Sequence, residues 1–554
     1  MVPESLTRLS AAGLVVLSLS LGLTSGSVRA QETPREPIAS APTPSPRADA
    51  VAGKRPASRA RGRANGAPSK RSAGPKTRRK RARPAARIAP RIGAWSATDG
   101  PAALAEALGA TLPGGVKGGW GAMVVSLSRG DTLFAVAPGA RLLPASTMKL
   151  FTSALALETL GPQHRFITEV LRDGVLAADG TLRGNLVLRG DGDPSISPRL
   201  LGGAAGDPMH KLALELKAAG IKRLTGDVIA DGTAFDDARI PDGWRKRYLG
   251  AAYAARVSAL SLNENLVWIV VNPGPKGAIV TTDPVTAGLP IESEVRVVKG
   301  RGGRISAWRR PDGSIKVRGT IGAAARERRW SLVVEDPALF AAGALRAALE
   351  AEGIDVAGKV RAGRASPVAP RIAMLPSPPL KEIVAAMNGE SINLFAELLF
   401  RNSARGPARA SVGNAVAAGN ALERFLSGKV GVDSGVVRAS DGSGLSILDR
   451  VTARSLVKLL GYGHLASWSA EYHASLPVAG ESETLRHRMR FTPAQGNLHA
   501  KTGTTNDVGS LAGYVTAKNG ELLAFAMIYN GRDRWRAKDR IDRAGASLAA
   551  FTRE

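Results

Sequence analysis

Three short groups of residues together supply hydroxyls, primary amines and an amide, the side chains that covalent acyl transfer by a serine-lysine pair requires. Ser146 precedes Lys149 by three positions, Ser391 precedes Asn393 by two, and Lys501 opens a Lys-Thr-Gly triplet. A serine hydroxyl is a weak nucleophile at neutral pH and must lose its proton to a nearby base as it attacks. Lys149 can accept that proton if burial and a neighbouring cation lower its pKa. The three groups therefore predict a serine-lysine acyl-transfer enzyme.

We expect the other polar residues of these groups to act in the same reaction. Lys501 is the expected second cation that lowers the pKa of Lys149. Ser391 can relay a proton between Lys149 and the leaving amine, while Asn393 can hold the lysine and the substrate amide. Taken alone, Ser391 and Asn393 are equally well interpreted as an N-cap for the helix expected at 394–400.

The Lys-Thr-Gly triplet occurs once and lies in a predicted strand. Gly503 allows a substrate backbone to approach closely, and the hydroxyls of Thr502 and Thr504 with the charge of Lys501 suit a terminal carboxylate. The amides of Ser146 and Thr504 are the expected oxyanion hole. The alternative is an ordinary charged edge strand. The strands expected here form a meander over 496–504, 508–516 and 521–529, with a hairpin turn at 518–520.

Two further serines match the same short motifs, and we call them decoys because the motif alone does not identify the nucleophile. Ser455 opens a second Ser-x-x-Lys pattern and Ser261 opens a second Ser-x-Asn pattern. Ser146 is favoured because the apolar run at 150–157 predicts a buried helix directly after it. Ser455 is instead expected inside a helix whose N-cap is Thr452.

With these motifs in this order, the chain resembles the D-alanyl-D-alanine carboxypeptidase/endopeptidase family of low-molecular-mass class C penicillin-binding proteins, peptidase family S13. The resemblance extends from about residue 118 to residue 530. Further stretches that carry it are Gly192-Asp193-Pro194, Ser258-Ala259-Leu260-Ser261, Met387-Asn388, Ala396-Glu397, Asp441-Gly442-Ser443-Gly444-Leu445-Ser446 and Ser475-Leu476-Pro477-Val478-Ala479-Gly480.

This resemblance implies a serine-type D-Ala-D-Ala carboxypeptidase, with or without endopeptidase activity, that acts on peptidoglycan stem peptides. The acyl-enzyme would form on Ser146, and β-lactams would acylate the same residue. No cofactor and no metal are implied. One departure is Glu483-Thr484-Leu485, where the family usually shows Gly-Thr-Leu, and we expect it to alter a loop near the site.

The implied fold is α/β, with a serine β-lactamase/transpeptidase-like catalytic domain in which helices cover an antiparallel sheet. Between Lys149 and Ser391 lie 241 residues, far more than such a core needs. A long insertion is therefore expected, and the resemblance implies that it forms two inserted, mainly β domains. The expected boundaries are 93–163 and 374–554 for the catalytic domain and 164–373 for the inserted region.

The N-terminal segment predicts export. An apolar stretch at 11–23 is followed by small residues suited to cleavage after Ala30, so 1–30 are expected to be a signal peptide. An uncleaved anchor is the alternative. The mature protein is then expected to be extracytoplasmic, in the periplasm or cell envelope.

The segment 31–92 is expected to be a disordered basic linker rich in Pro and Ala. It holds seventeen Lys or Arg against three Asp or Glu, with ten prolines and no aromatic residue. Its net charge of +14 is nearly half of the chain's +29. Behind an export signal, anionic wall polymers or a membrane surface are better partners than nucleic acid. A simple solvated spacer is the alternative.

Other functions fit the sequence less well. A β-lactamase-like hydrolase shares the serine-lysine machinery but does not account for the long insertion. A catalytically weak wall-binding module would not need Ser146, Lys149, Ser391 and Lys501 together. The chain has no Gly-x-Ser-x-Gly elbow, no His-Glu-x-x-His pattern and no cysteine, which argues against a Ser-His-Asp hydrolase and a metal enzyme.

Overall fold

The computed structural model describes residues 99–113, 115–287, 289–406 and 411–553. The expected signal peptide, 1–30, and the expected linker, 31–92, lie outside these ranges. Within them, no helix is long and apolar enough to cross a membrane.

A five-stranded antiparallel sheet joins the start and the end of the described chain. The strand order is β16-β17-β18-β1-β2, so the Lys-Thr-Gly strand β16 forms one edge. The expected meander is confirmed, since its three strands are consecutive neighbours. The bounds are β1 Gly119–Ser126, β2 Thr132–Val136, β16 His499–Thr504, β17 Val508–Thr516 and β18 Leu522–Asn530.

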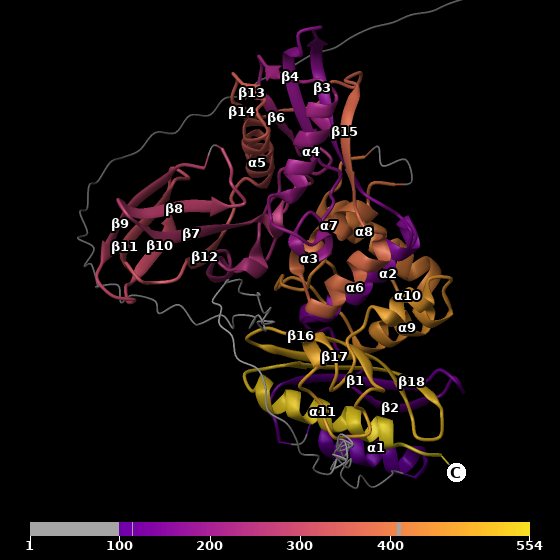
Figure 1. Ribbon diagram of the computed structural model, residues 1–554. Helices are drawn as coiled ribbons and strands as arrows, with labels where there is room; N and C mark the ends of the chain where they lie inside the picture. The colour runs from indigo at the N-terminus through magenta and orange to yellow at the C-terminus, as the bar shows by residue number, and fades with distance from the viewer. Residues whose placement is uncertain (1–98, 114, 288, 407–410, 554) are drawn as a thin grey trace, which may run out of the picture. The chain divides into compact units, whose positions relative to one another are not determined.

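Alternation along the strands gives this sheet two apolar faces. On β18, Ala524 and Ile528 belong to one core, whereas Phe525 and Met527 belong to the other. Helices α1 (Gly100–Thr111) and α11 (Arg534–Ala550) cover the second face, and Figure 1 shows the remaining helices of this domain on the opposite side. These are α2 Met148–Leu160, α6 Leu380–Glu390, α7 Asn393–Ser403, α8 Ala415–Phe425, α9 Ala453–Leu465 and α10 Ser469–Ala474.

Helix α2 lies in the middle of the helical layer. Every residue from Met148 to Leu157 is buried. A helix that is apolar on nearly all sides must be covered all round, and α6, α7, α8 and α9 provide that cover. The buried helix expected after Ser146 is therefore confirmed.

The inserted region contains a mixed seven-stranded sheet and two three-stranded sheets. Helices α4 and α5 pack with the larger sheet, and one apolar core includes residues from all three sheets. The larger sheet consists of β3 Ile167–Leu176, β4 Thr181–Arg189, β5 Arg223–Leu224, β6 Val228–Asp231, β13 Asp355–Val356, β14 Val360–Ala362 and β15 Arg371–Pro376. The smaller sheets consist of β7 Leu266–Gly274, β8 Gly277–Asp283, β9 Ile291–Val298, β10 Ile305–Arg309, β11 Ile315–Gly322 and β12 Arg328–Val333. The helices are α3 Pro198–Leu201, α4 Asp207–Ala218 and α5 Pro337–Ala351.

The expected architecture, an antiparallel sheet covered by helices and interrupted by β-rich insertions, is confirmed. Strand β15 spans the expected domain boundary at 373/374 and pairs with β3 of the inserted region. The inserted region also packs directly on the helices that cover the five-stranded sheet, because Phe235 and Val257 share a small apolar cluster with Leu394 and Leu398 of α7.

Candidate active site

Ser146 lies in a one-turn 3-10 helix, Ala145–Thr147, immediately before α2. The carbonyl of Pro144 holds this turn, since it accepts hydrogen bonds from the hydroxyls of Thr147 at 2.8 Å and Ser510 at 2.7 Å. Ala145 has a φ of 47°, a conformation that costs energy for a residue with a side chain. The turn leaves Ser146 half-buried at the start of the helix, within reach of Lys149.

Lys149 is fully buried, and its ammonium group reaches three acceptors. Its Nζ lies 3.0 Å from Ser146 Oγ, 2.6 Å from Asn393 Oδ1 and 3.0 Å from the carbonyl oxygen of Ser443. Burial lowers the pKa of Lys149 to about 7, against the opposing pull of the carboxyl groups of Asp441 and Glu397. A lysine with this pKa is partly neutral at physiological pH and can act as a base.

Ser391 and Asn393 flank the junction between α6 and α7. Ser391 ends α6 in the left-handed conformation, with a φ of 61°, and α7 begins at Asn393 after Ile392. The N-cap interpretation of these residues is wrong, because no side-chain hydrogen bond caps α7. Asn393 Oδ1 accepts from Lys149 and its Nδ2 donates to the carbonyl of Tyr253 at 2.9 Å.

Lys501 is the second buried cation of the site. Its Nζ donates to Ser391 Oγ at 2.9 Å and to the Thr502 carbonyl at 3.0 Å. Burial, reinforced by the nearby charge of Lys149, lowers its pKa well below the usual range. Thr504, at the end of β16, is exposed and open to a ligand.

Gly503 is the position where β16 comes closest to the turn that holds Ser146. A Cβ at this glycine would lie 2.1 Å from Ser510 Oγ, 2.7 Å from the Pro144 carbonyl and 3.1 Å from the Ser146 amide nitrogen. A side chain therefore does not fit here, and the strand can contact the nucleophile's turn only through glycine. The structure thus brings all eight predicted site residues, Ser146, Lys149, Ser391, Asn393, Lys501, Thr502, Gly503 and Thr504, to one end of α2 and β16.

The two decoy serines have local structural roles. Ser455 is buried in a capping box, in which its amide donates to Thr452 Oγ1 at 2.9 Å and the Thr452 amide donates to Ser455 Oγ at 3.1 Å. Ser261 donates to the Ser258 carbonyl and accepts from Asn265 Nδ2. Both hydroxyls are used within the fold.

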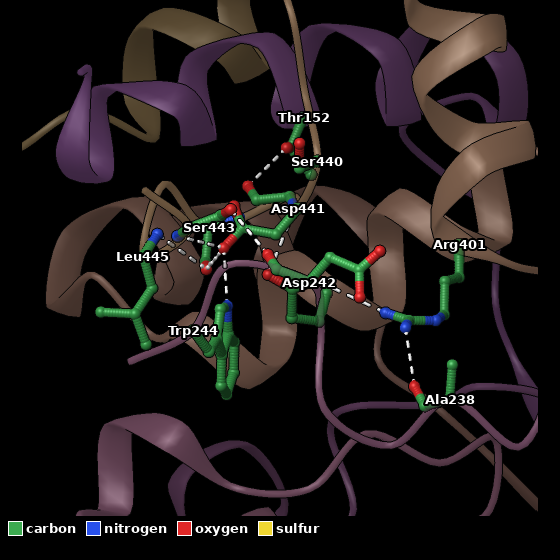
Figure 2. A network of polar contacts seen from close by, with 12 residues as sticks. Thr152, Ala238, Asp242, Trp244, Arg401, Ser440, Asp441, Ser443 and Leu445 are labelled. Atoms are coloured by element: carbon green, nitrogen blue, oxygen red, sulfur yellow. Dashed lines mark hydrogen bonds and ion pairs between the residues drawn. The ribbon is translucent and has the colours of Figure 1, made fainter. Parts of the chain in front are cut away.

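Sequence reasoning assigned no role to the loop that supplies the third acceptor of Lys149. The run Asp441-Gly442-Ser443-Gly444-Leu445-Ser446 crosses the site, and Asp441 and Ser443 are both buried. Figure 2 shows Asp441 at the centre of a polar network with Trp244 of the inserted region and Ser443. The sequence does hold a feature that could have indicated this loop. An aspartate followed by glycine and serine residues is typical of a tight turn in which the carboxylate accepts hydrogen bonds from nearby main-chain amides.

Glu397 of α7 is the other buried acid near Lys149. Burial, together with the charge of Asp441, raises its pKa to about 8. It accepts from the Gly442 amide at 3.2 Å and pairs with Arg401 at 3.4 Å. Among the described residues, no group of three or more His, Asp or Glu side chains is arranged to hold a metal ion.

The geometry brings together a hydroxyl suited to act as a nucleophile, a lysine whose pKa suits a base, and a second lysine that donates to a second hydroxyl. Comparison with known proteins points the same way. Residues 105–551 match the model of the D-Ala-D-Ala carboxypeptidase 3 (S13) family. A D-alanyl-D-alanine carboxypeptidase of Actinomadura sp. is 36% identical over 429 residues, which cover 74% of this chain and 77% of that protein.

A second relative is the D-alanyl-D-alanine carboxypeptidase DacB of Haemophilus influenzae, 28% identical over 403 residues that cover 70% of this chain and 81% of the relative. The crystal structure of penicillin binding protein 4 from the same organism is similar to this fold, with a TM-score of 0.65 at 25% identity, over 79% of this chain and 98% of that one. A further structure of that protein contains a β-lactam, and it matches with a TM-score of 0.61 at 23% identity over the same shares of the two chains.

Proposed function

The chain belongs to the D-Ala-D-Ala carboxypeptidase 3 (S13) family, and from this premise we propose how its site performs the reaction. The protein is a serine-type D-alanyl-D-alanine carboxypeptidase of the penicillin-binding class, as its motifs predict. Its substrates are peptidoglycan stem peptides, and β-lactams acylate it covalently. The roles of the individual residues below are our proposal.

Ser146 is the nucleophile and Lys149 is its base. The single observation that carries this assignment is the position of Lys149 Nζ, within 3.0 Å of Ser146 Oγ and 2.6 Å of Asn393 Oδ1. Ser146 Oγ forms a bond to the carbonyl carbon of the penultimate D-alanine as Lys149 takes the hydroxyl proton. The amides of Ser146 and Thr504 stabilise the negative charge that develops on the carbonyl oxygen.

The C–N bond to the terminal D-alanine then breaks, and the departing amine needs a proton. Ser391 is suited to relay to it the proton that Lys149 has taken, because the Ser391 hydroxyl contacts Lys501 at 2.9 Å and Ser391 is two residues from Asn393, the partner of Lys149. Water next attacks the ester carbon and gives a proton to Lys149. The bond to Ser146 Oγ breaks, Ser146 takes a proton back from Lys149, and the shortened peptide leaves the free enzyme.

The strand β16 binds the substrate by pairing with its backbone. It is the edge of the five-stranded sheet, and a bridge between Val478 and His499 covers only its beginning. Beyond that bridge, Thr502 and Thr504 present hydroxyls beside the charge of Lys501. We assign these groups to the terminal carboxylate of the stem peptide.

The N-terminal segments are proposed to place the enzyme outside the cytoplasm. The leader 1–30 would direct export, and the basic linker 31–92 would contact anionic wall polymers or membrane lipids. Deleting 31–91 should leave turnover of a diacyl-D-Ala-D-Ala peptide unchanged and reduce retention on anionic wall material. Loss of turnover would show that the linker is part of the active fold.

A fluorescent penicillin tests the assignment of the nucleophile directly. The wild type should be labelled, and peptide mass spectrometry should place the adduct on Ser146. Ser146→Ala should abolish the label, whereas Ser455→Ala and Ser261→Ala, which alter the two decoy motifs, should keep it. Labelling that survives in Ser146→Ala would disprove the assignment.

A further inference from the structure

Lys149 must present its lone pair, and not an N–H, to Ser146 Oγ when it acts as a base. A neutral amine has two N–H bonds and one lone pair, while an ammonium has three N–H bonds. Lys149 Nζ has three partners, of which Asn393 Oδ1 and the Ser443 carbonyl can only accept. In the neutral lysine these two acceptors take both N–H bonds, so the lone pair points at Ser146 Oγ. The position of the Ser443 carbonyl therefore decides where the base is aimed.

Asp441 fixes the loop that carries this carbonyl. Its Oδ1 accepts from the amides of Ser443 at 3.0 Å and Gly444 at 2.6 Å. Its Oδ2 accepts from the Ser446 amide at 2.8 Å and from the Ser443 hydroxyl at 3.1 Å. Four bonds from one buried carboxyl leave the segment around Ser443 little freedom to move.

The same carboxyl is bonded to the inserted region. Trp244 Nε1 donates to Asp441 Oδ2 at 2.8 Å, and Figure 2 shows the indole ring pointing at this group. Trp244 is buried. Gly444, next in the loop, adopts a φ of +82°, and a Cβ there would lie 1.8 Å from the Ala145 carbonyl, so the loop also packs on the turn that carries the nucleophile.

Charged groups from several elements act on Lys149. Asp441 from the loop and Glu397 from α7 raise its pKa, and Lys501 from β16 is the nearby cation. Arg401 pairs with Glu397 on the far side. Asp449, behind Asp441, has a pKa raised well above its usual range by burial and by Asp441. Removing the charge of Asp441 must therefore lower the pKa of Lys149 further.

We propose that Asp441 is a positioning residue for acylation: by holding the Ser443 carbonyl against Lys149 it aims the lysine at Ser146, and Trp244 makes this hold depend on the inserted region. The inference rests on the proposed roles of Ser146 and Lys149. The loop at 441–446 would then act in catalysis as well as packing between the inserted region and the turn that carries Ser146.

Asp441→Asn provides the test, because it keeps the shape of the side chain and replaces one accepting oxygen with a donating NH2 group. That group would face N–H donors on either side of the carboxyl. The rate constant for acylation by a fluorescent penicillin should fall about ten- to a hundredfold, the range expected when a reacting group is misplaced by about 1 Å. The dissociation constant of the initial complex should stay within about twofold.

The pH profile distinguishes this role from a structural one. Without the negative charge of Asp441, the pKa of Lys149 should fall. The rise of the acylation rate constant with pH, the acidic limb of the profile, should therefore move to lower pH, even as the maximal rate constant falls. Asp231→Asn is the matched control, because Asp231 is a buried aspartate that accepts three hydrogen bonds inside the inserted region. It should leave both the maximum and the limb unchanged.

Trp244→Phe is the second variant, and it keeps the test decisive if Asp441→Asn does not fold. It removes the indole N–H and should lower the acylation rate constant several-fold with the labelled residue still Ser146. A wild-type rate in either folded variant would overturn the positioning role. Absence of label on Ser146 in the wild type would instead overturn the proposed function on which this role depends.

Discussion

Lys149 Nζ lies 2.6 Å from Oδ1 of Asn393, a residue 244 positions later in the chain. The same amide side chain donates to the Tyr253 carbonyl in the inserted region. Asn393 therefore connects the base to a segment that lies between the two parts of the catalytic domain in sequence. The positions of Asn393 and of the Asp441 loop, which Trp244 contacts, consequently depend on how the inserted region packs.

The pH dependence of acylation should report the ionisation of Lys149. Because burial lowers the pKa of this lysine to about 7, the neutral base accumulates as the pH rises through 7. The acylation rate constant should therefore increase from pH 5 to pH 8 with a midpoint near 7. Stopped-flow measurements with a fluorescent penicillin can check this. A profile that is flat over this range would exclude Lys149 as the titrating base.

Asn393→Asp should move that midpoint upward. The substitution places a carboxylate where Oδ1 now contacts Lys149, and an adjacent negative charge favours the ammonium form. Acylation at pH 7 should fall about tenfold or more and recover partly at pH 9. Asn393→Ala serves as the comparison, since it removes both contacts without adding charge, and its rate should not recover at high pH.

Gly503→Ala should slow labelling strongly. The added carbon would meet Ser510 Oγ, the Pro144 carbonyl and the Ser146 amide at 3.1 Å or less, so β16 or the turn must move. We expect the acylation rate to fall at least a hundredfold. Gly509→Ala on the adjacent strand is the control, because its nearest neighbour would be the Arg534 carbonyl at 3.5 Å. Equal activity of the two variants would contradict the close approach.

Asp193 should make folding stability depend on pH in the inserted region. Burial raises the pKa of this carboxyl from 3.8 to about 7, so its contribution to stability is complete below pH 4 and is lost as the pH rises through 7. Asp193→Asn cannot ionise and should lack this loss. Thermal unfolding at pH 5 and pH 8 should show the wild type losing more stability than the variant between the two values. If the midpoint temperature of unfolding changed with pH in the same way for both proteins, Asp193 would not be the source of the pH dependence.

Local patterns were sufficient to predict the elements that carry the site. The apolar run after Ser146 predicts a buried helix, and the alternation around the Lys-Thr-Gly triplet predicts the three-stranded meander. Both depend on side chains a few positions apart, and the structure confirms them. The N-cap interpretation of Ser391 and Asn393 fails for a tertiary reason, since Lys501 and Lys149 take these side chains as partners.

The sequence by itself determined which chemical groups are present and their local spacing: a serine three residues before a lysine, a glycine after Lys501-Thr502, and acids within short polar runs. Only the tertiary structure decided that the Ser443 carbonyl, 294 residues from Lys149, completes the surroundings of the base. Any residue can supply a main-chain carbonyl, so the sequence carries no mark of this acceptor. Its place is set by the packing of a loop against an inserted domain, through Asp441 and Trp244.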